Sequence, residues 1–228
     1  MNTPSPGITA PDLQVARLRR LDSCAISDAF DQLGLPAAIS GIAPRAARRR
    51  IAGRVVTVKL AGGPRADGSR SHLCTLAIES AQHGDIIVVE QSTGIDAAGW
   101  GGILSAAAHV RGLSGAIIEG PARDLDEAAE IGFPVYSRSA TSRTARGRVH
   151  EVATGTPVEI GGVIVATGDY VVADTSGVAF IPASLIDGVL EAAESIAARE
   201  THMTQAVLSG EPVSTVMSAS YEEMLARR

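Results

Sequence analysis

Two short turns carry the residue types with the clearest chemistry. The first is the run Trp100-Gly101-Gly102-Ile103-Leu104, which opens an apolar helical segment, and the second is Gly120-Pro121-Ala122-Arg123-Asp124. Twenty residues separate Gly102 from Arg123, enough for one helix and one strand, so we expect the turns side by side. A helix start offers unpaired backbone N–H groups to an anion, while Arg123 and Asp124 offer a forked cation and a hard metal ligand. These groups predict a site for a small carboxylate with a neighbouring carbonyl, held partly by a divalent ion.

Both turns also have structural interpretations. Asp124 can act as the N-cap of the helix predicted from Leu125, and adjacent glycines at 101 and 102 can allow close packing. The pair Arg123 and Asp124 follows a buried strand, and ligands gather at the carboxyl ends of strands in α/β sheets. This position favours a functional role for the pair, whereas for Gly101 and Gly102 the sequence leaves both interpretations open.

The other reactive side chains form no recognisable motif. The five histidines are scattered, without the i, i+4 pair that a zinc site uses. Cys24 and Cys74 lie in no CxxC pattern and are interpreted as buried small apolar residues. Lys59 is the only lysine and falls within a predicted strand, so a Schiff base has one candidate. Since hydrolase, Walker and dinucleotide motifs are also missing, metal-assisted carbonyl chemistry is favoured. Asp126 and Glu127 are interpreted as solvated helix charges.

The composition is that of an ordinary globular protein. A chain of 228 residues can bury one substantial core, built here from aliphatic residues because only 3% are aromatic. A net charge of -5 gives no reason to expect a nucleic-acid or membrane partner, and Arg48-Arg49-Arg50 is interpreted as a solvated or interface segment. No apolar run approaches the ~18 residues of a membrane span, and residues 1–6 lack signal-peptide features, so we expect a cytoplasmic protein.

The order of the predicted elements indicates an α/β fold. Apolar strands alternate with helices between residues 53 and 137, which predicts a core with parallel pairing. Short strands separated by turn residues over 149–181 predict an antiparallel or barrel-like layer, and a long Ala/Glu-rich helix follows from Pro182 to about Ser209. The predicted parts are a disordered N-terminus over 1–10, a single domain over 11–210 and a tail with a weak helix over 211–228.

With these motifs the chain resembles the RraA-like family, which includes the class II 4-hydroxy-4-methyl-2-oxoglutarate/4-carboxy-4-hydroxy-2-oxoadipate aldolases. The matching pattern is Gly102, twenty residues, Arg123-Asp124, two residues and Glu127. The likeness extends from about residue 18 to 205. Supporting stretches are Ser27-Asp28-Ala29, Gly53 to Val58, Gly84 to Val89, Ile131 to Val135 and Asp174 to Val178.

The resemblance implies an α-β-β-α sandwich related to swivelling phosphohistidine-type domains, with a C-terminal helix. It implies a homotrimer or homohexamer with sites between subunits, and Mg²⁺ or Mn²⁺ bound through Asp124 and several waters. In that picture a pyruvate-like 2-oxo acid chelates the metal, and its carboxylate meets the backbone at Gly101, Gly102, Ile103 and Leu104. Arg123 contacts the carbonyl oxygen.

The implied activity is cleavage of a C–C bond in a small 2-oxo acid. This is either retro-aldol cleavage of a 4-hydroxy-2-oxo acid, which releases pyruvate, or decarboxylation of oxaloacetate. The metal and Arg123 would stabilise the enolate. The alternative is a non-catalytic binding protein, as in the family's regulators of ribonuclease E, for which the charge of -5 suits a basic partner surface. Regulators often lack an acid at the position of Asp124, which this chain keeps.

Three positions bear on substrate choice. Many aldolases of the family carry an acid directly after the first glycine of the Trp-Gly turn, where it can hold a metal-bound water, but this chain has Gly102. The tail has Val216-Met217-Ser218 in place of a Gly-Met-Arg stretch. Glu200 matches a catalytic glutamate of the C-terminal helix that reaches a neighbouring subunit's site. The altered tail, together with the polar loop over 62–71, predicts a substrate other than the family's aromatic-degradation intermediates.

Overall fold

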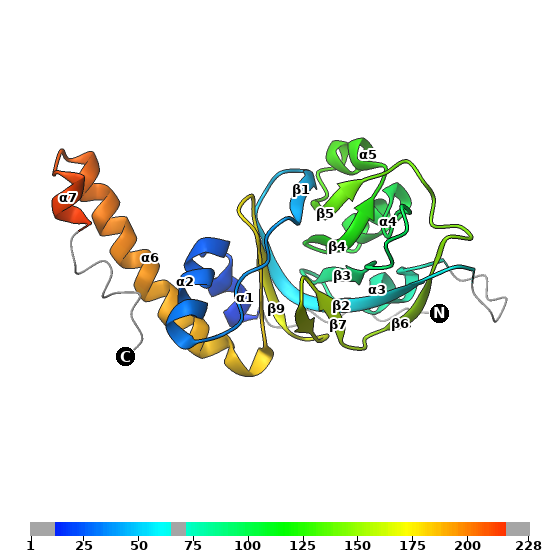
Figure 1. The fold of residues 1–228 in the computed structure, drawn as a ribbon, viewed down its shortest axis with the longest axis horizontal. Helices are drawn as coiled ribbons and strands as arrows, with labels where there is room; N and C mark the ends of the chain where they lie inside the picture. Colours follow the sequence, from blue (N-terminus) through cyan, green and yellow to red (C-terminus); the bar gives the residue numbers. More distant parts are fainter. Residues whose placement is uncertain (1–11, 65–71, 218–228) are drawn as a thin grey trace, which may run out of the picture.

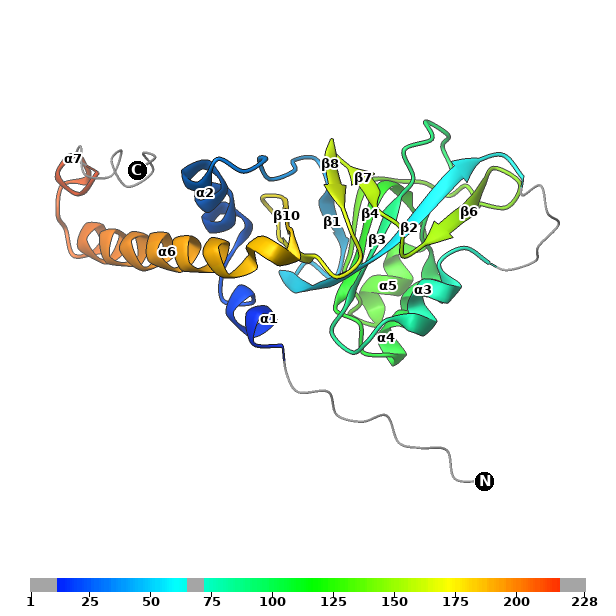
Figure 2. The same cartoon turned by 90° about the horizontal axis from the view of Figure 1, so that it is seen from below.

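The computed structural model describes residues 12–64 and 72–217, which form a curled mixed sheet with helices against both of its outer surfaces (Figures 1 and 2). Eight strands of the described chain form the main sheet in the order β1-β5-β4-β3-β2-β9-β10, with β6 also paired to β2, and β7 and β8 form a separate hairpin. The strands are β1 (Ala43–Ala46), β2 (Ile51–Gly62), β3 (Ile86–Glu90), β4 (Gly115–Ala122), β5 (Val135–Ala140), β6 (Val149–Thr154), β7 (Val158–Ile160), β8 (Val163–Val165), β9 (Tyr170–Ala173) and β10 (Val178–Ile181).

The helices fall into two groups. One group, α3, α4 and α5, covers the parallel strands, and the other, α1, α2 and α6, covers the β9 and β10 side (Figure 1). The helices are α1 (Leu13–Leu18), α2 (Ser23–Leu33), α3 (Thr75–Ser80), α4 (Gly102–Val110), α5 (Leu125–Glu130), the 3-10 turn η1 (Ala183–Leu185), α6 (Ile186–Leu208) and α7 (Val213–Val216).

The long strand β2 connects the two halves of the sheet. Its first residues, Ile51 to Arg54, pair antiparallel with β9, and Val55 to Lys59 pair parallel with β3. Its last residues pair antiparallel with β6. β3, β4 and β5 continue the sheet in parallel, so their carboxyl ends lie along one edge.

Alternating side chains explain the layers. On β3, Ile87 and Val89 pack into the cluster beneath α3, α4 and α5, while Ile86 and Val88 pack into a central cluster on the opposite face. β9 repeats this pattern. Tyr170 and Val172 face the cluster of α1, α2 and α6, whereas Val171 and Ala173 face the central cluster. Period-two alternation of apolar residues on both faces is what buries a strand on both sides.

The predicted α/β class, the parallel core and the C-terminal helix are confirmed. Of the two alternatives predicted after residue 149, the antiparallel pairing forms: β6, β9 and β10 join the main sheet through β2, and β7 and β8 pair as a hairpin. β1 was not predicted; its residues Ala43–Ala46 include a proline and pair with β5. The likeness to swivelling phosphohistidine-type domains stays a prediction.

Helix α2 ends at Gly34 with a left-handed φ of 67°, as glycine allows. Cys24, on the same helix, is exposed, which corrects its interpretation as a buried residue, whereas Cys74 is buried. The predictions for residues 1–10, for a helix over 221–228 and for most of the 62–71 loop lie outside the described residues. In the described chain no helix is long and apolar enough to cross a membrane.

Candidate active site

The two turns singled out in the sequence lie side by side at the carboxyl ends of β3 and β4. A parallel bridge joins Trp100 to Ala122, and the Arg123 N–H donates to the Trp100 carbonyl at 3.0 Å. Below them the buried Trp100 ring stacks on Phe133 with 6.3 Å between centroids. Backbone pairing and a buried aromatic pair therefore fix the position of both turns.

The close approach of the turns also depends on Gly120. Its φ of 154° is one that side chains rarely adopt, and an added Cβ would lie 2.6 Å from the Gln91 carbonyl oxygen. The absence of a side chain at Gly120 therefore allows β4 to run close beside Gln91, the residue that follows β3.

Asp124 occupies the N-cap position of α5, but its side chain does not cap that helix. It precedes α5 with a left-handed φ of 55°, and its side chain makes no capping hydrogen bond. Instead Oδ2 accepts hydrogen bonds from the Gly102 N–H at 3.0 Å and from Arg123 Nε at 3.0 Å. Among the described residues Oδ1 has no hydrogen-bond donor. Burial raises the pKa of Asp124, but the Gly102 and Arg123 bonds outweigh it and lower the pKa below its usual value.

Glu127 occupies the space that a side chain at position 102 would need. A Cβ added to Gly102 would overlap the Glu127 carboxylate and would lie 3.0 Å from Asp124 Cβ. An added Cβ on Gly101 would lie 3.0 Å from Asp124 Oδ2. Gly101 and Gly102 therefore allow the close packing of Asp124 and Glu127, whereas the approach of a ligand carboxylate to their backbone stays a prediction.

A cavity of about 220 Å³ opens at this point. Arg123 and Asp124 line it with the start of α4, from Gly101 to Leu104. In the described chain the N–H groups of Ile103 and Leu104 have no carbonyl acceptor, as expected for the first turn of a helix. The Ile103 side chain is exposed and that of Leu104 is buried in the core.

Two residues that the sequence analysis did not assign also line this cavity. Arg146 comes from the loop between β5 and β6 and His72 from the segment before α3. The loop is drawn back to the site by two backbone hydrogen bonds, from Ala98 N–H to the Arg143 carbonyl and from Thr141 N–H to the Ala122 carbonyl, both 3.0 Å. Nothing in the sequence around Arg146 signals this return.

Other candidates lie elsewhere. Glu200 is on α6 and does not line the cavity; the label of α6 lies on the opposite side of the sheet from α4 and α5 (Figure 1). Burial, with the neighbouring charges of Asp28 and Asp22, raises its pKa. Within one chain, therefore, Glu200 is not brought to Arg123 and Asp124. Lys59 pairs with Glu90 at 3.2 Å and does not line the cavity.

The mixed α/β fold thus sets an Arg-Asp pair against a glycine-opened helix over a small cavity, and this cavity is the candidate active site. The chain belongs to the RraA-like family, described as Aldolase/RraA, whose sequence model matches residues 23–180.

Individual relatives carry different names. The chain is 29% identical over 185 residues to a protein of Halalkalibacterium halodurans named "Putative 4-hydroxy-4-methyl-2-oxoglutarate aldolase", covering 79% of this chain and 81% of that protein. It is 26% identical over 212 residues to protein DlpA of Legionella pneumophila, covering 91% of this chain but only 34% of DlpA. The chain thus spans about a third of the length of DlpA.

A solved structure extends the likeness to the fold. Streptomyces coelicolor RraAS2, titled an unusual member of the RNase ES inhibitor RraA protein family, superposes with a TM-score of 0.77 at 25% identity, covering 86% of this chain and 99% of that one. The family therefore contains proteins named as aldolases and proteins named as ribonuclease inhibitors.

Proposed function

We propose that this protein is a divalent-metal-dependent lyase that cleaves a C–C bond in a small 2-oxo acid, by retro-aldol cleavage of a 4-hydroxy-2-oxo acid or by decarboxylation of oxaloacetate. The observation that carries the proposal is the Asp124 carboxylate. One of its oxygens is held by Gly102 and Arg123, and the other has no donor among the described residues. A carboxylate oriented in this way is suited to hold a hard cation.

The donor set fits Mg²⁺ or Mn²⁺ better than zinc. In the described part of the chain no three His, Cys, Asp or Glu side chains gather closely enough to hold a metal. Mg²⁺ is commonly bound through one or two carboxylates and several waters. Asp124 would be the direct ligand, and Glu127, at the same helix start, would orient a water. When bound, the metal would supply the positive charge that polarises the 2-oxo group.

The remaining chemistry falls to the chain's own groups. The unpaired N–H groups at the start of α4 would bind the substrate carboxylate. Arg123 uses Nε on Asp124, which leaves its terminal nitrogens to donate to the oxygen that becomes negative in the enolate. Both proposed reactions leave an enolate of pyruvate, so one arrangement serves both.

Arg146 supports a substrate with a second acidic group. It lines the cavity but has no carboxylate partner among the described residues. We assign it to the distal carboxylate of a 4-hydroxy-2-oxo diacid, because guanidinium groups recognise carboxylates by paired hydrogen bonds.

The proposal includes assembly into a homotrimer or homohexamer. Glu200 is remote from the site of its own chain, and the second half of α6 extends beyond the body (Figure 1). In an assembly, this helix would bring Glu200 to a neighbouring chain's Asp124. Analytical ultracentrifugation, combined with mixing of Glu200→Gln and Asp124→Asn chains, tests the arrangement. Activity regained on mixing supports shared sites, and a monomer with full activity contradicts them.

The experiment that tests the lyase is pyruvate release from a panel of 4-hydroxy-2-oxo acids and oxaloacetate. We expect turnover that requires Mg²⁺ or Mn²⁺, disappears with EDTA and returns on adding the metal. Turnover that is unchanged in EDTA would overturn the mechanism.

A second candidate is a non-catalytic regulator, favoured by the likeness to RraAS2. A pull-down that recovers a ribonuclease, together with no turnover on any oxo acid of the panel, would place the protein in that class.

A further inference from the structure

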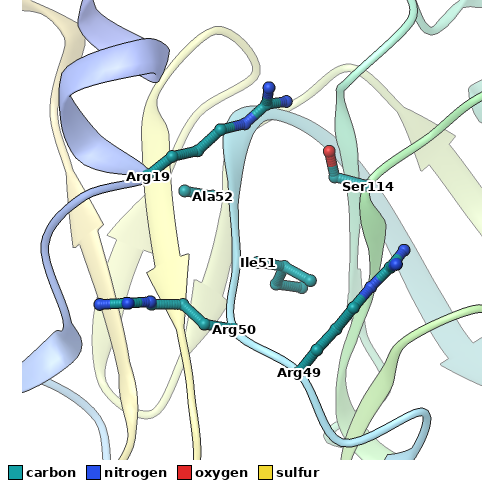
Figure 3. A pocket seen from close by; sticks show the side chains of 6 residues that line it. All are labelled: Arg19, Arg49, Arg50, Ile51, Ala52 and Ser114. Atoms are coloured by element: carbon teal, nitrogen blue, oxygen red, sulfur yellow. The ribbon is translucent and has the colours of Figure 1, made fainter.

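A second and larger cavity lies at the opposite end of the parallel strands from the candidate active site. It measures about 380 Å³ and is lined by Arg19, Arg49, Arg50, Ile51, Ala52 and Ser114 (Figure 3). Ile51 is the first residue of β2, and Ser114 directly precedes β4, whereas Arg123 directly follows β4. The two cavities are therefore separated by the length of the sheet and cannot share one small ligand.

The arginines of this cavity differ from several others of the described chain in having no carboxylate partner there. Several arginines of the described chain are paired with carboxylates, such as Arg17 with Glu194, Arg54 with Asp12 and Arg138 with Glu119. In contrast, Arg19, Arg49 and Arg50 have no carboxylate partner and no side-chain hydrogen bond to another described residue. No carboxylate is among the residues that line the cavity. Arg19 and Arg49 thus present two guanidinium groups to the side of the hollow near Ser114, and Arg50 adds a third on the other side of Ile51, in a chain whose net charge is -5.

The backbone that presents these arginines is fixed from below. The hydroxyl of the fully buried Tyr136 donates a hydrogen bond to the Arg49 carbonyl at 2.8 Å. The same hydroxyl lies 3.0 Å from the Ala173 carbonyl. Ser114 Oγ donates to the Gly84 carbonyl at 2.8 Å, so its own hydrogen is used within the protein and only its lone pairs face a ligand. Ile51 and Ala52 are buried and form an apolar floor, which strengthens charge interactions above it.

The polar side chains of the cavity come from the end of α1, from the segment before β2 and from the residue before β4. In Figure 3, Arg19 comes from the end of α1 and Arg49 from the segment before β2, and both extend toward the side of Ser114, while Arg50 extends to the other side of Ile51. A ligand in the hollow would therefore meet cations from more than one direction. This arrangement suits a compact anion with oxygens on several sides.

From these observations we infer that the cavity is a binding site for a phosphate dianion, either free or as a small phosphate monoester. A dianion with several exposed oxygens offers acceptors to both Arg19 and Arg49, which extend to the same side of the hollow. The volume of about 380 Å³ falls within the range of small-ligand sites. A nucleic acid is less suitable, because no aromatic side chain lines the cavity for base stacking.

The test is isothermal titration of the full chain, at low ionic strength, with inorganic phosphate and with glycerol phosphate as probes. We expect saturable binding of one anion per chain. Arg19→Gln or Arg49→Gln should each weaken binding by about tenfold, and the triple variant with Arg50→Gln by a hundredfold or more, the scale of lost charge-assisted hydrogen bonds. Tighter binding of the ester identifies an organic ligand, and equal binding identifies free phosphate.

Two variants serve as matched controls. Arg48→Gln removes the same charge from the adjacent residue, which does not line the cavity, and should change the affinity by less than about twofold. Arg123→Gln reports binding at the candidate active site and should leave phosphate binding intact. The inference is overturned if the triple variant, still folded by circular dichroism, binds phosphate normally, or if Arg48→Gln weakens binding equally. Tighter binding of citrate than of either phosphate, or saturable binding of an RNA oligonucleotide alone, also overturns it.

Discussion

The Gly102 N–H at the first residue of α4 donates a 3.0 Å hydrogen bond to Asp124 Oδ2, across twenty-one intervening residues. The bond attaches the proposed metal ligand to the helix that would bind the substrate carboxylate. It therefore couples the positions of the two groups, and a displacement of one turn displaces the other.

Replacing Asp124 by Asn should abolish activity while the fold survives. Asn tolerates the left-handed backbone at this position, and its amide oxygen can still accept from Gly102, but it loses the charge that holds the cation. We expect a melting temperature within a few degrees of the parent and loss of Mn²⁺ binding, measured by titration calorimetry. An Asp124→Asn chain with parental metal affinity would show that the ligand has been assigned wrongly.

Replacing Arg123 by Lys separates substrate binding from metal binding. Lysine keeps the charge but loses the planar fork, so the variant should lose about 2–4 kcal/mol of transition-state stabilisation, the scale of one oxyanion donor. This corresponds to roughly 30- to 1,000-fold in kcat/KM. Metal affinity should stay close to parental, and full activity would exclude Arg123 from the reaction.

Arg146 and its neighbour Arg148 give a matched pair. Arg148 binds the Thr144 carbonyl at 3.2 Å and does not line the cavity. Arg146→Gln should raise KM for a diacid by about tenfold or more, the value of a charged hydrogen bond, and leave oxo acids without a distal carboxylate unaffected. Arg148→Gln should leave the KM for both classes of substrate nearly unchanged. An equal rise in KM for all substrates would contradict the assignment.

The overlap between position 102 and Glu127 predicts a compensating pair of substitutions. Gly102→Asp alone should lower activity, because its side chain displaces the Glu127 carboxylate and presses on Asp124. Adding Glu127→Ala should restore part of it, since the new acid then fills the vacated space. Kinetics of the two single variants and the double variant measure the coupling. Strictly additive losses would show that the two side chains do not compete.

Asp174 predicts a stability loss in acid. Burial raises its pKa, but hydrogen bonds from Ser23 Oγ at 2.6 Å, from Ser23 N–H at 2.7 Å and from Ser176 N–H outweigh burial and lower the pKa below the usual 3.8. A carboxyl whose pKa is lower in the folded state stabilises the fold fully above its unfolded pKa. That contribution is lost as the pH falls through the folded pKa.

Thermal melts between pH 7 and pH 2 check this expectation. Asp174→Asn should cost about 2 kcal/mol at pH 7, the scale of charged hydrogen bonds, and its melting temperature should fall less steeply below pH 4. Parallel curves for the two proteins would mean that Asp174 does not contribute to the acid sensitivity.

The parts of the site that sequence could predict are local. Gly102 and Arg123 are separated by one helix and one strand, and such a unit brings its two turns together by geometry alone. The cavity role of Arg146 depends on a loop folded back through Ala98, and the exposure of Cys24 depends on how α2 packs. These are non-local contacts, and the residue types around them carry no signal. Glu127 is exposed, as interpreted from the sequence, but its position beside Gly102 could not be predicted, because glycine has no side chain whose type would indicate the contact.

The pairing of β9 with β2 is equally non-local, and it has a consequence for how the molecule can be divided. One half of β2 completes the layer under α1, α2 and α6, and the other half completes the layer under α3, α4 and α5. A break in the chain between β2 and β9 leaves β9 and β10 without the strand on which they pair, and a break before β2 separates α1 and α2 from α6, with which they share a core. The two helical layers should therefore unfold in a single transition, and fragments made on either side of β2 should recover structure only when they are combined.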